Sequence, residues 1–418
     1  MAQRYDVVIV GGGHGGAQTA IALRQHKLAG SVAIVGEEPA LPYERPPLSK
    51  DYLARKKGRE ALLLRSAAFW ADRSIHMQSG RRVIGVEPDA KAIVTSEGER
   101  LDYGSLVWAT GGHARRLSCR GHDLRGVHYV RTAADIDRLH GELNPGARIA
   151  IIGGGYIGLE VAATLSGLGH AVTLVEALDR VLARAAGETI SRFLEAEHAA
   201  RGVDVRLSAK VEAIEGTNGC VSAVRLTTGE CLAADIIIVG IGIIPETSAL
   251  SAAGAKVSNG VQVDEFCRTS LPDIFAVGDC ALHANPYAGG EFVRLESVQN
   301  ANDMALTVSR SIVGAPEPYR ALPWFWSNQY DLRLQTAGLS AAHTETVIRG
   351  SPADKSFSVV YLRDSCVLAL DCINAPRDFM HGRLLIERQA RISKEMLEDC
   401  SQSLKQIAER CPGPTAAQ

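Results

Sequence analysis

One pattern of glycines occurs twice in this chain of 418 residues, each time after a short β-branched run. The two copies comprise Gly11, Gly13, Gly16, Gly153, Gly155 and Gly158. In a strand–turn–helix unit, the first glycine permits a tight turn, the second lets a pyrophosphate approach the backbone, and the third lets the helix pack on the strand. One such pattern alone is weak evidence, whereas two complete copies predict two dinucleotide-binding units of the Rossmann type.

Each copy continues with a helix, a second strand and an acidic residue. Strand 31–35 leads to Glu37 in the first copy, and strand 171–175 leads to Glu176 in the second. An acid about 20 residues past the last glycine accepts hydrogen bonds from ribose hydroxyls. A 2′-phosphate beside Glu176 would bring like charges together in a partly desolvated cleft. The sequence therefore predicts a preference for NADH over NADPH.

Composition and charge exclude several classes of protein. Hydrophobic residues make up 46% of the chain and the formal net charge is -2, which fits a globular protein without sequence-wide attraction to nucleic acid or anionic membranes. No apolar run reaches the ~18 residues of a membrane span, and the first residues do not resemble a signal peptide. The nine cysteines include no CxxC pair, so no zinc site or disulfide framework is indicated. We expect a cytoplasmic protein without a bound metal.

Alternating strands and helices predict an α/β fold, with two Rossmann-like dinucleotide-binding domains plus a smaller C-terminal α+β domain. We expect a strand over 269–279 and, in the last part of the chain, a hairpin of strands 356–361 and 367–371 before a helical tail at 394–410. The predicted boundaries give a discontinuous first domain at 1–112 and 246–322, a second domain at 113–245 and a third at 323–418.

Several short boxes together resemble the two-dinucleotide flavoprotein disulfide reductase superfamily. They are the first glycine turn, Ala109–Gly111, the box GGGYIGLE at 153–160 and the box FAVGD at 275–279. Within it, RPPLSK at 45–50, ESVQN at 296–300 and PWFWS at 323–327 resemble the NADH-dependent ferredoxin reductases of oxygenase systems, the putidaredoxin reductase-like branch.

The resemblance implies that the first domain binds FAD and the second binds NADH. It further implies that NADH reduces FAD by hydride transfer. The flavin then passes single electrons to a 2Fe-2S ferredoxin that supplies an oxygenase. The thiol-using members of the superfamily carry a cysteine soon after the first strand pair, but residues 40–60 contain none. Cys280, which follows Asp279, is expected to be a buried structural thiol, so electrons should pass directly from flavin to partner.

The resemblance also implies roles for individual residues. Lys50 would lie beside flavin N5 and stabilise the reduced ring, Glu160 would hold that cation, and Trp326 would lie near the ring. Without the resemblance, Lys50 would be an ordinary surface lysine and Glu160 an acid at a helix N-terminus.

Further residues are implied to contact the two cofactors. Two arginines would neutralise FAD phosphates, Asp279 would accept from ribityl hydroxyls, and Val83 and Val298 would offer backbone contacts. The FAD set is Gly11, Gly13, Gly15, Gly16, Glu37, Arg45, Pro47, Lys50, Val83, Ala109, Thr110, Gly111, Arg131, Asp279, Val298 and Trp326. The NAD set is Gly153, Gly155, Tyr156, Ile157, Gly158, Glu176, Arg184 and Gly242.

Two questions stay open at the level of sequence. The basic run 55–57 with Arg59 is either a solvated face or a rim that attracts an acidic ferredoxin. The acceptor could instead be rubredoxin or that of another FAD-dependent NADH reductase. A redox-sensing interaction protein of the apoptosis-inducing-factor type is a third possibility, although residues 323–418 leave little room for its long C-terminal insertion.

Overall fold

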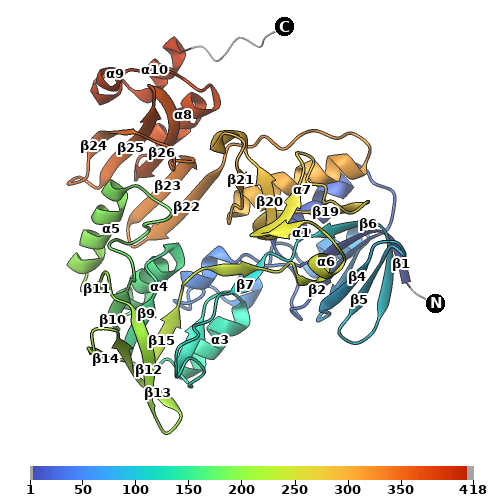
Figure 1. The fold of residues 1–418 in the computed structure, drawn as a ribbon, viewed down its shortest axis with the longest axis horizontal. Coiled ribbons are helices and arrows are strands. Elements are labelled where there is room, and N and C mark those ends of the chain that lie inside the picture. Colours follow the sequence, from blue (N-terminus) through green and yellow to red (C-terminus); the bar gives the residue numbers. More distant parts are fainter. Residues whose placement is uncertain (1–2, 412–418) are drawn as a thin grey trace. The chain divides into compact units, whose positions relative to one another are not determined.

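The computed structural model describes residues 3–411, which form two compact units (Figure 1). The first unit comprises residues 3–44, 60–113 and 244–325. The second comprises residues 45–59, 114–243 and 326–411. The second unit thus holds both the second glycine pattern and the C-terminal region, so the division into three domains at the boundaries given above stays a prediction.

The first unit is built on a seven-stranded sheet in the order β3-β2-β1-β6-β5-β4, with β19 also paired to β6. Its strands are β1 (Gln3–Val10), β2 (Val32–Gly36), β3 (Ile75–Ser79), β4 (Val83–Glu87), β5 (Ala92–Thr95), β6 (Arg100–Trp108) and β19 (Ile274–Ala276). The pairs from β3 to β6 and the pair β19–β6 are parallel. Side chains such as Val8 and Ile9 are fully buried, as expected for a parallel sheet covered on both faces.

Helices and a smaller sheet complete the first unit. Helix α1 packs against α7, which starts at a serine N-cap. The helices are α1 (His14–Gln25), α2 (Ala67–Asp72), α6 (Ser248–Ala252) and α7 (Val298–Ile312). The smaller sheet contains β17 (Val257–Ser258), β18 (Gly260–Val263), β20 (Ala281–Ala284) and β21 (Phe292–Val293).

The second unit repeats the parallel architecture in the order β11-β10-β9-β15-β8. These strands are β8 (Val127–Tyr129), β9 (Arg148–Ile152), β10 (Ala171–Val175), β11 (Asp204–Arg206) and β15 (Ile236–Val239), with helices α3 (Ala133–Glu142), α4 (Tyr156–Gly167) and α5 (Glu188–Ala200). A three-stranded antiparallel sheet follows, made of β12 (Val211–Thr217), β13 (Cys220–Leu226) and β14 (Cys231–Ala233). The short strands β7 (Gly112–Ala114) and β16 (Ile243–Pro245) pair with each other.

The C-terminal part is a five-stranded sheet in the order β22-β23-β26-β25-β24, followed by three helices. The elements are β22 (Trp324–Gln329), β23 (Leu332–Gly338), β24 (Glu345–Ser351), β25 (Ser356–Arg363), β26 (Cys366–Ile373), α8 (Pro376–Glu387), α9 (Lys394–Glu398) and α10 (Leu404–Arg410). The predicted hairpin is therefore present as β25 and β26, and it turns at Asp364 and Ser365, both in the left-handed region. The predicted α+β region is confirmed.

Two predicted elements differ from the structure. The strand expected over 269–279 is confined to β19, because Asp273 and Gly278 adopt positive φ and residues Gly278–Cys280 form a 3-10 turn. The helical tail is interrupted between α9 and α10, where Ser403 caps the second helix. Within residues 3–411, no helix is long and apolar enough to cross a membrane.

Candidate active site

The first glycine turn needs glycine at two positions and leaves open space at the third. A Cβ on Gly11, whose φ is +116°, would lie 2.2 Å from the carbonyl oxygen of Ala109. A Cβ on Gly16 would lie 1.9 Å from the oxygen of Gly11, whereas one on Gly13 would meet nothing within 4 Å. Gly13 is also the extended N-cap of α1, so first-turn N–H groups face that open space. This arrangement fits a dinucleotide pyrophosphate.

The second glycine turn has the same construction. A Cβ on Gly153, at φ +107°, would lie 2.4 Å from the oxygen of Gly240, and one on Gly158 would lie 2.0 Å from the oxygen of Gly153. Gly155 caps α4 in extended conformation, and the nearest atom to its Cβ would be 4.0 Å away. The residues present therefore fit two dinucleotides, one in each unit.

Three predicted segments of the first unit meet at one edge of its sheet. Strands β1, β6 and β19 are parallel neighbours, and Gly11, Ala109 and Asp279 lie just beyond their carboxyl ends. Backbone bonds hold the three segments together, from Ala109 N to Val10 O at 2.7 Å and from Val277 N to Trp108 O at 3.0 Å. The carboxyl edge of a parallel sheet is the usual position for a bound ligand.

The remaining predicted FAD residues of the first unit lie around this edge. Glu37 follows β2 and its side chain is 69% exposed. The backbone N–H of Arg81, two residues before Val83, donates to Gly36 O at 2.8 Å, which brings that segment beside Glu37. Val298 is the first residue of α7, where backbone N–H groups lack intrahelical acceptors. Thr110 Oγ1 donates to Glu246 O at 2.8 Å and Gly111 has positive φ, while Gly15 lies on the buried side of α1.

In the second unit, Lys50 and Glu160 form an ion pair. Lys50 ends the 3-10 turn Pro46–Ser49, and Glu160 lies in α4 with only 3% of its surface exposed. Ser49 Oγ donates to Glu160 Oε2 at 2.5 Å, and Ser327 Oγ donates to Oε1 at 2.8 Å. The pair is thus buried on its acidic side, unlike an ordinary surface lysine with a helix N-terminal acid. The buried Glu160 carboxylate thus has one cation and two hydroxyl donors as partners, as a buried charge requires.

Other predicted flavin residues in this unit gather near the same loop. The Arg45 guanidinium donates to the carbonyl oxygen of Arg131 at 2.6 Å. Pro47 lies within the 3-10 turn, and Trp326 precedes Ser327 on β22. The basic run is partly compensated, because Arg59 pairs with Asp137 at 2.6 Å and Lys57 with Asp51 at 3.6 Å.

Glu176 makes contacts that the sequence did not predict. Its Oε2 accepts from Gly154 N at 2.6 Å, and its Oε1 accepts from Leu178 N at 2.8 Å. The carboxylate therefore fixes the second glycine turn and the loop after β10. Arg184 and Ile157 are exposed, and burial raises the pKa of Tyr156. Gly242 has φ +96° and open space around its Cβ position.

Two serines of the site were missed at the level of sequence. Ser49 and Ser327 each lie beside a predicted residue, inside the RPPLSK and PWFWS boxes. Their position within those boxes was the available signal. A serine carries no charge, however, and its partner Glu160 is distant in sequence.

The cysteines form no disulfide in the described part of the chain. All nine are free, and Cys280 is fully buried with its Sγ 3.3 Å from Val277 O. Burial raises the pKa of Cys280, which keeps it a thiol. Cys280 is therefore a buried thiol, as predicted. Among residues 3–411, no group of three or more His, Cys, Asp or Glu side chains is arranged to hold a metal ion.

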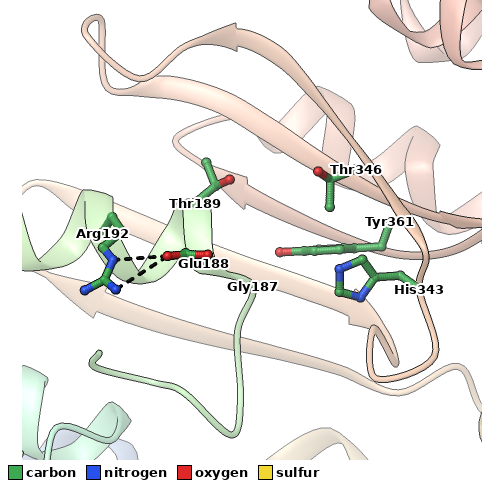
Figure 2. A pocket seen from close by; sticks show the side chains of 7 residues that line it. All are labelled: Gly187, Glu188, Thr189, Arg192, His343, Thr346 and Tyr361. Atoms are coloured by element: carbon green, nitrogen blue, oxygen red, sulfur yellow. Dashed lines mark hydrogen bonds and ion pairs between the residues drawn. The ribbon is translucent and has the colours of Figure 1, made fainter. Parts of the chain in front are cut away.

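A cavity of about 480 Å³ lies elsewhere in the second unit, at the start of α5 (Figure 2). Its lining consists of Gly187, Glu188, Thr189, Arg192, His343, Thr346 and Tyr361. The Tyr361 hydroxyl donates to the buried carboxylate of Asp371 at 2.6 Å. No predicted site residue lines this cavity, so it is separate from the candidate active site.

Comparison with known proteins agrees with this arrangement. Residues 5–305 match the family described as pyridine nucleotide-disulphide oxidoreductase, and residues 324–408 match the reductase C-terminal family. A ferredoxin–NAD(P)+ reductase from Sphingomonas sp. is 57% identical, covering 94% of this chain and 95% of its own length. Putidaredoxin reductase from Pseudomonas putida is 39% identical, covering 96% of both chains.

Solved structures give the same result. The crystal structure of a covalent putidaredoxin reductase–putidaredoxin complex matches with a TM-score of 0.94 and 38% identity, over 98% of this chain and 99% of that one. The predicted α/β class with a separate C-terminal region is confirmed. The chain belongs to the pyridine nucleotide-disulphide oxidoreductase family, whose members use FAD and NAD(P)H.

Proposed function

We propose that this chain is an FAD-dependent NADH:ferredoxin oxidoreductase that serves an oxygenase. The choice of acceptor rests on one observation, the 57% identity over nearly the whole chain to a ferredoxin–NAD(P)+ reductase. A second relative, at 54% identity over 96% of this chain, is the ferredoxin reductase subunit of 5,5'-dehydrodivanillate O-demethylase from Sphingobium sp.. Its name supports an oxygenase system as the destination of the electrons.

Bound FAD supplies the conversion of one hydride into two single electrons. The residues of the chain bind and orient the reactants. The first glycine turn, with Glu37 and Asp279, would hold FAD, and the second, with Glu176, would hold NADH. Arg45 and Arg131 would balance phosphate charge, while Pro47 and Trp326 would flank the flavin ring. Lys50 would offer its ammonium group at flavin N5, and Glu160 keeps that ammonium group in place through the observed ion pair.

The partner is proposed to be a 2Fe-2S ferredoxin. Ferredoxins are typically acidic, and the exposed lysines of the run 55–57 support attraction of such a partner, although Lys57 and Arg59 have acidic neighbours. A cytoplasmic location stays a prediction.

The test is NADH-driven reduction of cytochrome c with purified protein, with and without added ferredoxins of the 2Fe-2S type. Strong dependence on one ferredoxin is expected. Equal turnover with rubredoxin would instead indicate a rubredoxin reductase. A rubredoxin–NAD(+) reductase from Pseudomonas putida is 37% identical to this chain. Slow turnover with a long-lived NADH–flavin complex would instead favour the redox-sensing alternative.

A further inference from the structure

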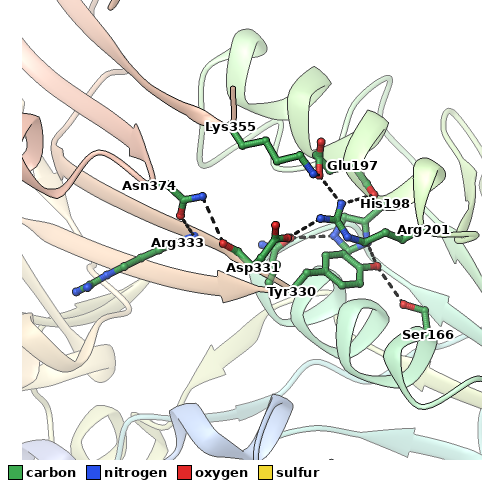
Figure 3. A network of polar contacts seen from close by, with 10 residues as sticks. Ser166, Glu197, His198, Arg201, Tyr330, Asp331, Arg333, Lys355 and Asn374 are labelled. Carbon is green, nitrogen blue, oxygen red and sulfur yellow. Dashed lines mark hydrogen bonds and ion pairs between the residues drawn. The ribbon is translucent and has the colours of Figure 1, made fainter. Parts of the chain in front are cut away.

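A continuous line of hydrogen-bonded polar side chains runs from the end of α4, where Ser166 and Tyr330 are partly buried, to the buried Glu160. Ser166 Oγ lies 3.0 Å from the Tyr330 hydroxyl, which lies 3.2 Å from His198 Nδ1 (Figure 3). His198 Nε2 lies 2.9 Å from Gln329 Oε1, and Gln329 Nε2 donates to Ser327 Oγ at 3.1 Å. Ser327 then donates to Glu160 Oε1. The line therefore ends on the carboxylate that pairs with Lys50.

The inner members of the line are closed off from solvent. His198 is fully buried, and Ser327, Gln329 and Glu160 are between 1% and 3% exposed. A buried polar group without its partner destabilises a protein, so each of these contacts has to be satisfied within the line. Apolar side chains could pack at these four positions without loss of stability. The polar side chains there therefore point to a role beyond packing.

The chemistry of the donors gives the line one direction. Gln329 offers its amide N–H to Ser327, so its oxygen faces His198 and must receive the proton on Nε2. Nδ1 of the neutral ring is then an acceptor for the Tyr330 hydroxyl, which in turn accepts from Ser166. Burial lowers the pKa of His198, and the Arg201 guanidinium acts in the same direction, which favours the neutral ring. Every donor points toward Glu160.

The opposite arrangement would remove one hydrogen bond from Glu160. If His198 carried its proton on Nδ1, the Gln329 amide would turn over and its oxygen would take the proton of Ser327. Ser327 has a single hydroxyl proton, so it would no longer donate to Glu160. The tautomer of a histidine two side chains away thus decides how many donors the carboxylate receives.

We propose that His198, Gln329 and Ser327 are positioning residues, which orient the Glu160 carboxylate as the counter-ion of Lys50. Hydrogen bonds to the charged form stabilise a carboxylate, and a fixed carboxylate restricts where the ammonium group can lie. The inference rests on the proposed function only for the role of Lys50 at the flavin. The link between His198 and Glu160 is a property of the chain itself.

Charged side chains surround Tyr330 and His198, at the end of the line farther from Glu160. Arg201 stacks over the Tyr330 ring at 4.4 Å and bonds to Asp331 at 2.5 Å, while Glu197 pairs with Arg201 and with Lys355 at 2.8 Å. Figure 3 shows these side chains from α5, the β22–β23 turn and the turn before β25 converging on the histidine. The network holds the Tyr330 ring in place beside His198.

The test measures the carboxyl of Glu160 directly in the FAD-loaded protein, without NADH or acceptor. Carbon-13 NMR of protein labelled at the glutamate Cδ gives the chemical shift of this carboxylate, and Glu160→Gln assigns the signal. We expect Ser327→Ala to change the Cδ chemical shift of Glu160, since the carboxylate loses one hydrogen bond. His198→Phe should change the chemical shift in the same direction, and His198→Gln, which restores an amide donor, should return it to the value of the unmutated protein.

His128→Phe is the matched control, because His128 is also a buried histidine of the second unit but bonds to Glu142 at 3.1 Å. It should leave the signal of Glu160 unchanged. The rate of flavin reduction by NADH should change in the same variants as the NMR signal. If His198→Phe fails to bind FAD, Ser327→Ala provides the test. An unchanged Glu160 signal in both His198→Phe and Ser327→Ala would overturn the proposal. The expected change in the signal, together with an absence of ferredoxin turnover, would overturn only the proposed function.

Discussion

The two glycine turns have nearly the same backbone but carry different chemistry. Gly11 and Gly153 have φ of +116° and +107°, and a Cβ on Gly16 or Gly158 would come within 1.9 or 2.0 Å of a carbonyl oxygen. The second residue after the last glycine is Gln18 in α1, whereas it is Glu160 in α4. Only the second copy places a buried acid at this position, and it pairs with Lys50. The comparison separates residues that build a dinucleotide site from residues that act in it.

The acids after the second strands differ in a similar way. Glu37 is largely exposed and pairs with Arg82 at an N–O distance of 3.9 Å. Glu176 accepts from two backbone N–H groups of its own unit. The first acid is thus available for a ligand, while the second also shapes the loop that would surround one.

The largest effect should come from the glycines that both copies share. Gly16→Ala and Gly158→Ala would each force a Cβ against backbone oxygen, so we expect a loss of more than about 4 kcal/mol in the free energy of unfolding, or no folded protein. Gly13→Ala and Gly155→Ala are the matched controls, since their Cβ positions are open. These should fold but lose FAD and weaken NADH binding, respectively. Urea unfolding measures the stability of the variants, and flavin absorbance measures their FAD content. A normal unfolding midpoint for Gly16→Ala would contradict the prediction.

The next largest effect concerns Lys50, which pairs with an acid found only in the second copy of the glycine pattern. Lys50→Met removes the cation from Glu160, and we expect flavin reduction by NADH to slow by about 100-fold, or about 2.7 kcal/mol. FAD content should stay near one per chain. Lys57→Met, an exposed lysine of the same segment, is the control and should leave the rate unchanged. Stopped-flow absorbance gives the rates, and an unaltered rate for Lys50→Met would remove it from the active site.

The comparison also shows how far sequence alone could lead. The glycine turns, the strand at 171–175 and the hairpin of β25 and β26 follow from local patterns, because turn residues and β-branched runs fix them within a few residues. Lys50 and Glu160 could be linked only through the family resemblance, since 110 residues separate them. Ser327, Gln329 and His198 were not identified, because uncharged or single polar residues on a strand or helix give no pattern that points to a distant partner.

A third prediction concerns the two acids. We expect the unmutated protein to prefer NADH over NADPH by tens to hundreds of fold in kcat/KM, about 2 kcal/mol, because Glu176 would repel a 2′-phosphate. Glu176→Gln removes the charge and keeps one of the two backbone contacts, so it should narrow the preference while it disturbs the loop less than Glu176→Ala does. Glu176→Ala should narrow it too, but with weaker NADH binding. Glu37→Gln is the control variant. Equal kcat/KM values for NADH and NADPH in the unmutated protein would contradict this role of Glu176.

The smallest effect compares one buried titratable group in each unit. Burial lowers the pKa of His283 to about 4 in the first unit, and burial raises the pKa of Asp371 to about 6 in the second. His283 stabilises the fold above its unfolded pKa of about 6.5, and this contribution is lost as the pH falls toward 4. The contribution of Asp371 is complete below its unfolded pKa of 3.8 and is lost as the pH rises through 6.

Acidification from about pH 7.5 to about pH 5.5 should therefore act on the two units with opposite signs, by about 1 kcal/mol each. Asp371→Asn keeps an oxygen for the Tyr361 hydroxyl but cannot ionise, so it should be more stable than the unmutated protein at the higher pH and should not gain stability on acidification. His283→Gln keeps an acceptor for Asn285 and should lose less stability on acidification than the unmutated protein. Urea unfolding at the two pH values measures each difference. If both variants showed the pH dependence of the unmutated protein, these two groups would not be the titrating pair that distinguishes the units.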